Sequence, residues 1–177
     1  MTHNSYYRSF LKFVTGLTND RPADVADLVG RWDEPEMGPV PPVADEDFPE
    51  VSAFLDRWGE VIDSTGEADR VRLLNALLAE AAAYPRITEH DGYSWHLHYQ
   101  DDGMRLPAVL RGVTSVAAAQ YLTSTSLHRL GRCAAAECRR AFVDFTRSGT
   151  QRYCTHACVN RDAVRRHRAR RKEMLSP

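Results

Sequence analysis

The sequence lacks any long apolar run, which argues against a membrane protein. Its longest stretch without a charged residue, 112–127, contains Thr, Ser and Gln and is too short to cross a bilayer as a helix. The apolar cluster at 10–17 is broken by Lys12 and has neither the basic start nor the cleavage site of a secretory signal. We therefore expect a cytoplasmic protein without a membrane partner.

Motifs that carry catalysis are also missing. Residues 1–128 contain no Gly-rich phosphate loop, no metalloprotease helix and no Ser-His-Asp order typical of a catalytic triad. With 43% hydrophobic and 27% charged residues, the composition is that of an ordinary globular protein. We expect a folded protein that is not an enzyme.

The formal net charge of −1 hides a segregation of charges along the chain. Residues 129–177 hold 13 Lys and Arg against four acidic residues, whereas residues 1–128 hold 10 against 20. This asymmetry predicts a larger acidic domain, 1–128, followed by a small basic module, 129–177.

Apolar residues recur at helical spacing over most of residues 1–128. The periodicity predicts helices at 5–17, 48–63, 67–83 and 107–127. A further short helix is expected after Asn19 or Asp20, either of which would cap it, with Pro22 in its first turn. The four prolines and six acidic residues of 33–47 predict an extended linker or a surface loop.

A change to a period of two over residues 87–99 predicts a β-hairpin with one buried face. The apolar residues expected on that face are Ile87, Tyr93, Trp95, Leu97 and Tyr99. The polar face carries His96 and His98, which are expected in solvent; a metal or small-ligand site with Glu89 or His90 is the alternative. The first domain is thus predicted to be mainly α with a small β-hairpin.

All four cysteines lie in the last quarter of the chain. They are Cys133, Cys138, Cys154 and Cys158, spaced as two short pairs in the pattern Cys-x4-Cys-x15-Cys-x3-Cys. In a reducing compartment such pairs are typical of metal ligands, and four thiolates fill every position of a tetrahedral Zn²⁺. We expect one structural zinc ion. An iron–sulfur site, a thiol redox switch, or His156 in place of one thiolate are the alternatives.

The residues around the cysteines indicate how such a site is built. Alternation over 142–145 and a turn at Ser148–Gly149 predict a hairpin between the two pairs. Cys158 is expected in the first turn of a helix beginning near His156, where unpaired N–H groups favour a thiolate. A hairpin followed by a ligand-bearing helix predicts a treble-clef-like zinc module.

Residues 133–172 resemble the CGNR zinc finger family. The resemblance lies in the four cysteines, the run 142–144, the segment 152–154, the pair Asn160–Arg161 and the arginine-rich tail; Val159 stands where the family has glycine. Such modules follow a helical domain called ABATE, which residues 1–128 resemble in their second half. The resemblance implies a bacterial, stress-related transcriptional regulator.

The segment after the last cysteine is a basic helix in this interpretation. Its expected DNA contacts are Asn160, Arg161, Arg165, Arg166, Arg168, Arg170, Arg171 and Lys172. A solvated helix, or one docked on the acidic domain, is the alternative, and RNA is less favoured because aromatic residues are not interleaved with the basic ones.

Together these features predict a zinc-dependent transcriptional regulator that binds double-stranded DNA and lies at the nucleoid when bound. The N-terminal domain would sense a signal, such as a small-molecule effector, or mediate self-association as a homodimer. The competing hypothesis is a protein-interaction adaptor whose basic zinc module binds an acidic partner.

Overall fold

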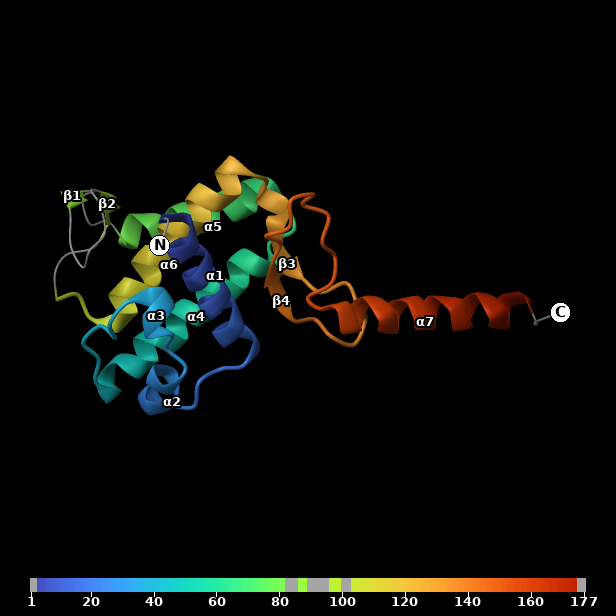
Figure 1. Ribbon diagram of the computed structural model, residues 1–177, viewed down its shortest axis with the longest axis horizontal. Helices are drawn as coiled ribbons and strands as arrows, with labels where there is room; N and C mark the ends of the chain where they lie inside the picture. The colour runs from blue at the N-terminus through green and yellow to red at the C-terminus, as the bar shows by residue number, and fades with distance from the viewer. Residues whose placement is uncertain (1–2, 82–85, 89–95, 100–102, 175–177) are drawn as a thin grey trace.

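Helix α1 (His3–Asn19) lies at the centre of a helical body in the computed structural model, which describes residues 3–81, 86–88, 96–99 and 103–174 (Figure 1). It packs against α4 (Phe48–Asp63) and α6 (Leu106–Ser124), and α5 (Glu67–Glu80) packs against both α4 and α6. The apolar stripes of these helices meet in one core, as their periodicity predicted. Its most buried large side chains include Phe10, Leu28, Leu55, Trp58, Leu77 and Leu110.

Helix α2 (Val25–Gly30) begins later than the sequence predicted. Asp24 is its N-cap, and the Asp24 carboxylate accepts a hydrogen bond from Asp27 N at 2.8 Å. The expected cap at Asn19 or Asp20 is wrong, because α1 continues to Asn19 and the amide side chain of Asn19 is bonded elsewhere.

The proline-rich segment 33–47 has more structure than an extended linker. It contains the short helix α3 (Glu34–Met37) and the 3₁₀ turn η1 (Asp45–Asp47). Met37 is buried in the main core, and Asp47 is buried where Arg105 binds it at 2.8 Å. The segment therefore lies against the helical body.

Strands β1 (Arg86–Thr88) and β2 (His96–His98) pair in antiparallel fashion, with Ile87 opposite Leu97. The predicted pairing of the hairpin is confirmed. The prediction that Ile87 is buried is wrong, because this side chain is 72% exposed. The other residues of the predicted hairpin site, Glu89 and His90, lie outside the described residues, as do Tyr93 and Trp95.

A second hairpin joins the helical body to the C-terminal helix. Strand β3 (Leu130–Arg132), which follows the 3₁₀ turn η2 (Leu127–Arg129), pairs with β4 (Ala141–Val143). Leu130 and Ala141 belong to the main core. The predicted module of a hairpin plus a helix is confirmed, but the turn is not at Ser148–Gly149. Strand β4 pairs with the preceding strand β3, with Phe142 opposite Gly131, because the segment that holds the first cysteine pair forms the turn between the two strands.

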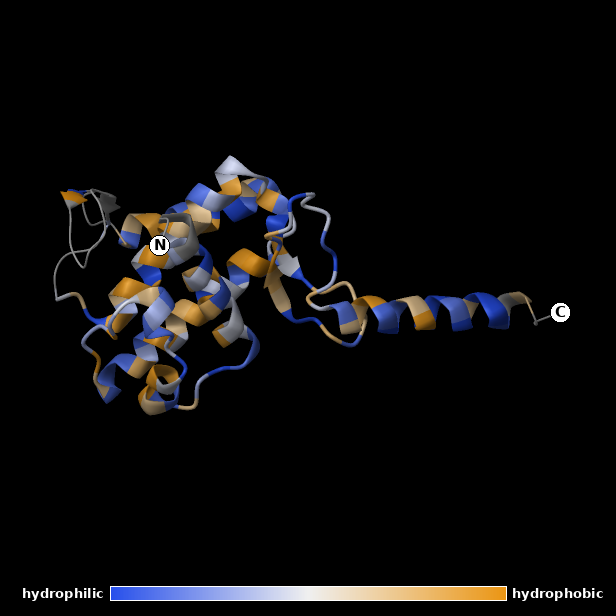
Figure 2. Ribbon diagram, in the orientation of Figure 1, coloured by the Kyte–Doolittle hydropathy of each residue, from blue (hydrophilic) through white to orange (hydrophobic). Residues whose placement is uncertain are grey.

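Helix α7 (His156–Met174) projects away from the helical body, and the β3–β4 hairpin lies between the two (Figure 1). The helix is mostly hydrophilic along its length (Figure 2). Beyond Asp162 each described side chain through Lys172 is exposed. Within the described part of the chain, no helix combines the length and apolar character needed to span a bilayer.

Candidate metal centre and basic helix

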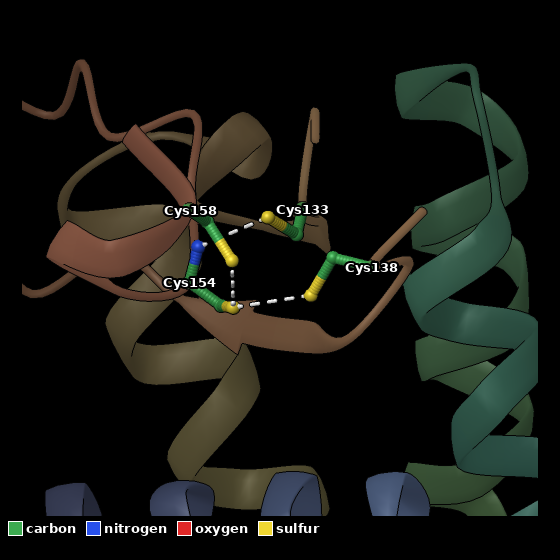
Figure 3. A group of neighbouring side chains, drawn as sticks. All are labelled: Cys133, Cys138, Cys154 and Cys158. Carbon is green, nitrogen blue, oxygen red and sulfur yellow. Dashed lines mark hydrogen bonds between the residues drawn. The ribbon is translucent and has the colours of Figure 1, made fainter. Parts of the chain in front are cut away.

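Four cysteines converge where the β3–β4 hairpin meets α7 (Figure 3). Cys133 follows β3, Cys138 precedes β4, Cys154 lies just before α7, and Cys158 lies in its first turn. Their Sγ atoms all lie within 4.8 Å of one another. Within the described ranges, these four are the cluster of possible metal ligands that the fold brings together.

The spacing of the sulfurs fits one tetrahedral zinc ion. With Zn–S bonds of about 2.3 Å, two thiolates on a tetrahedron lie about 3.8 Å apart. Cys154 Sγ lies 3.6 Å from Cys138 Sγ and 3.8 Å from Cys158 Sγ. A multi-iron cluster spreads its cysteines over several metal atoms and holds them farther apart. The four cysteines are therefore consistent with one structural Zn²⁺, with every coordination position filled by sulfur.

The first cysteine pair lies in a tight turn that the backbone holds together. Cys133 N donates to Arg140 O at 2.8 Å, and Cys138 N donates to Ala135 O at 2.9 Å. Arg139 completes the turn with a φ of 52°, in the left-handed region that glycine adopts more easily. We call residues 133–140 the zinc knuckle.

The second cysteine pair is held by the start of α7. Thr155 occupies the N-cap position, and its Oγ1 accepts a hydrogen bond from Cys158 N at 3.3 Å. The pKa of Cys158 is lowered to about 7, chiefly by its hydrogen bond with Thr155, while burial raises the pKa of Cys154 to about 12. Four thiolates at this spacing repel one another, so a bound divalent cation is what allows all of them to ionise.

The loop between β4 and the second pair is organised by Asp144. This buried carboxylate accepts from Thr146 Oγ1 at 2.5 Å, from Thr146 N at 2.8 Å and from Gln151 N at 2.9 Å. Burial acts to raise its pKa, but these hydrogen bonds, that of the Thr146 hydroxyl first, lower it. Arg129 donates to the carbonyl oxygens of Asp144 and Thr146. Gly149 has a φ of 67° and leaves the space that the Arg129 guanidinium occupies.

Asp162 anchors α7 to the zinc site. It is 5% exposed, and its carboxylate accepts from Tyr153 Oη at 2.7 Å. Arg165 Nη2 binds the same carboxylate at 2.8 Å and Arg166 Nε at 3.0 Å. The pKa of Asp162 is lowered, first by the hydrogen bond from Tyr153 and second by the hydrogen bond from Arg165. The sequence pattern gave no role to Asp162; its one signal was an acidic residue inside an arginine-rich helix.

The predicted DNA-contact residues fall into two groups. Arg165 and Arg166 are held by Asp162, so their guanidinium groups have fixed positions. The others are exposed, and the arginines among them form no ion pair with a carboxylate in the described part of the chain; these residues are Asn160, Arg161, Arg168, Arg170, Arg171 and Lys172. The structure therefore presents an arginine-rich helix, and its contacts with DNA stay a prediction.

A groove of about 460 Å³ runs between the zinc knuckle and α7. Ala135, Ala136 and Glu137 line one side, and α7 residues from Asn160 to Arg168 line the other. The sequence did not predict this groove, because its two sides are separated in the chain and come together only when the four cysteines meet at the metal site.

Two side-chain contacts fix the β3–β4 hairpin on the helical body. The Asn19 amide at the end of α1 donates to Ala141 O at 2.9 Å and accepts from Ala141 N at 2.6 Å. Arg132 binds both carboxylate oxygens of Asp63, at 2.8 and 2.9 Å. Both contacts join residues more than 60 positions apart, which is why the local sequence pattern did not reveal them.

Buried Arg70 ties the end of α4 to the segment that enters β3. Its Nη2 donates to Ser64 O at 2.7 Å, and its Nη1 donates to Leu127 O. Burial lowers the pKa of Arg70, and among the described residues backbone carbonyls and the Ser64 hydroxyl satisfy its guanidinium. Charge in this position is thus used to hold three chain segments together.

A hairpin and a helix that bring four cysteines onto one point define a structural zinc-binding module. Residues 129–171 match the family described as CGNR zinc finger, so this segment is a zinc finger of that type. The match begins at Arg129, and the resemblance of residues 1–128 to the ABATE domain stays a prediction. No match was found among curated proteins.

Proposed function

We propose that the chain is a zinc-dependent, non-enzymatic DNA-binding regulator in which α7 contacts double-stranded DNA. One observation carries the proposal: α7 is attached through the zinc site at its N-terminal end and projects from the body with exposed arginines that lack carboxylate partners among the described residues (Figure 1). The exposed surface of α7 is mostly polar and rich in arginine, so a polyanion is the partner that its charge favours.

The dimensions of α7 suit the major groove. An α-helix with its side chains is about 10–12 Å wide, and the major groove of B-DNA is about 12 Å wide. At 19 residues, α7 extends about 28 Å. Its arginines can therefore reach phosphates on both sides of the groove.

The root of α7 is the best place for reading bases. Asn160 and Arg161 lie two and three residues after the last zinc ligand and border the groove beside the zinc knuckle. Asparagine pairs with adenine and arginine with guanine in the major groove, whereas the arginines farther along are suited to phosphates. Val159, in place of the family glycine, is helical and 36% exposed, so its side chain lies on the surface of this root.

The helical body is the proposed regulatory part. We propose that it senses a signal, such as a small-molecule effector, or mediates self-association as a homodimer. The cytoplasm, at the nucleoid, is the compartment in which DNA and reduced thiolates occur together.

The test measures binding of mixed-sequence duplex DNA by fluorescence anisotropy over a range of salt. Replacing Arg168, Arg170 and Arg171 with glutamine removes three phosphate contacts, which should reduce the log–log salt slope by about 2.7 and weaken binding at physiological salt about a hundredfold. Zinc content should be unchanged. Equal binding by the variant and the wild type would overturn the proposal.

A matched control separates site-specific contacts from the loss of net charge. Replacing Arg21, Arg57 and Arg72 with glutamine removes the same charge from arginines of the helical body that are paired with carboxylates. This variant should bind DNA nearly as the wild type does. If polyglutamate binds α7 as tightly as DNA and with the same salt dependence, the protein-interaction adaptor is the better description.

A further inference from the structure

Most arginines in the described part of the helical body are paired with nearby carboxylates. Arg21 binds Asp56 at 2.8 Å, and Arg31 binds Asp27. The same holds for further pairs in the described part of the body: Arg57–Glu80, Arg72–Asp69, Arg105–Asp47 and Arg111–Glu50. This pattern suits an acidic domain whose basic residues serve its own packing.

Two cations of α1 depart from that pattern. Arg8 and Lys12 are exposed, and neither forms an ion pair with a carboxylate in the described ranges of the chain. They stand four residues apart on one face of α1, where like charges repel and weaken the helix. We call them the α1 cation pair. A local cost of this kind, in a domain rich in acids, indicates a partner of negative charge.

The α1 cation pair lies on the zinc module. The guanidinium carbon of Arg8 is 4.7 Å, and Lys12 Nζ is 5.9 Å, from the centre of the Phe145 ring. Phe145 is wedged between α1 and α6, because Tyr121 packs on the same ring at 4.9 Å. The pair is therefore at the junction of the helical body with the loop that follows β4.

The loop that follows β4 carries further side chains of the kinds that bind phosphate groups. Arg147 follows Phe145 by two residues and is exposed without a carboxylate partner among the described residues. Thr146, Ser148 and Thr150 are exposed residues, and their hydroxyls are linked in a chain, at 3.5 and 3.0 Å. The Thr146 hydroxyl also donates to the Asp144 carboxylate, which leaves those of Ser148 and Thr150 to meet a phosphate. Arginine, lysine and hydroxyl groups are the side chains that most often contact the phosphate backbone.

We propose that the α1 cation pair and Arg147 form a second phosphate-contact site, so that the helical body itself binds the backbone of DNA held by α7. The inference rests on the proposed function and extends it beyond the zinc finger. Its competitor is a purely structural role, in which Arg8 and Lys12 only pack on Phe145. Packing would affect stability, whereas phosphate contact affects the salt dependence of binding.

The experiment compares log–log salt slopes for the full zinc-loaded chain on mixed-sequence duplex DNA. Arg8→Gln with Lys12→Gln should reduce the slope by about 1.8, and Arg147→Gln alone by about 0.9, because each lost phosphate contact is worth about 0.9. Exchanging the two residues, Arg8→Lys with Lys12→Arg, keeps the charges and should keep the slope. Arg21→Gln with Arg72→Gln is the charge-matched control.

Three outcomes decide the matter. Reduced slopes in the first two variants, with the exchange variant and the control near the wild type, support the second site. An unchanged slope, or a reduction equal to that of the control, overturns the second site while leaving the proposed function in place. Failure of the wild type to bind DNA overturns the proposed function and this inference with it.

Discussion

Removal of zinc should unfold α7 and leave the helical body folded. The small cluster around the sulfurs buries only Cys133, Ala135 and Cys158, too little apolar surface to hold the module alone. Most helical stability in proteins comes from tertiary packing, and the described side chains of α7 from Ala163 to Lys172 are exposed, so the metal, with a binding free energy of about 10–16 kcal/mol in such sites, supplies the stability. The β3–β4 hairpin differs, since Leu130 and Ala141 are part of the main core.

The expected size of the effect follows from the helix lengths. Helix α7 supplies about a fifth of the α-helical residues in the described part of the chain. Titration with a chelator should therefore lower the far-ultraviolet ellipticity by about a fifth. Trp32 and Trp58 are buried in the helical body, and their fluorescence should not change. Added Zn²⁺ should restore the signal, whereas Mg²⁺, which prefers oxygen ligands, should not.

Two results would refute this reasoning. Unchanged ellipticity after complete zinc removal would show that α7 is stable without the metal. A much larger loss, together with a shift in tryptophan emission, would show that the body and the module unfold as one unit.

Three substitutions test the junction and the loops around the metal. Asn19→Ala leaves the buried N–H and C=O of Ala141 without partners and should lower the free energy of unfolding by about 2–4 kcal/mol in urea; a loss below about 1 kcal/mol would contradict this. Gly149→Ala places a methyl group 2.7 Å from Arg129 Nη2 at a positive φ, and should cost about 1–3 kcal/mol and lower the melting temperature; an unaltered melting temperature would show that the loop adapts freely. Arg139→Gly relieves a left-handed arginine and should stabilise the zinc-loaded protein by up to about 1 kcal/mol; destabilisation would mean that the side chain contributes more than its backbone costs.

The helices and the cysteine cluster could be predicted because their signals are local and periodic. Helix α4 has the predicted bounds, 48–63, and α7 begins at His156 as expected. Cysteine identity and pair spacing indicated a common metal site, and the structure brings the four sulfurs together. In each case the pattern within a short window contains what the fold uses.

The errors concern residues whose partners are distant in the chain. Asn19 reads as a helix cap, yet its amide bonds Ala141 across 122 positions. Alternation over 142–145 correctly indicated a strand, but it could not show that the partner of this strand is the preceding strand β3. The charge of Arg70 favours a position on the surface, yet the residue is buried, and carbonyl oxygens of α4 and Leu127 accept hydrogen bonds from its guanidinium. Tertiary hydrogen bonding overrides the local preference at all three positions.

The contacts of Asn19 and Arg132 hold the β3–β4 hairpin on the helical body, so they also set the direction in which α7 projects. Because the helix extends about 28 Å, a tilt of about 10° at the hairpin displaces its tip by about 5 Å. That displacement exceeds the rise of about 3.4 Å along the DNA axis from one phosphate of a strand to the next. If α7 binds DNA as proposed, a small change in the angle between the β3–β4 hairpin and the helical body would therefore change which phosphates the arginines near the end of α7 reach.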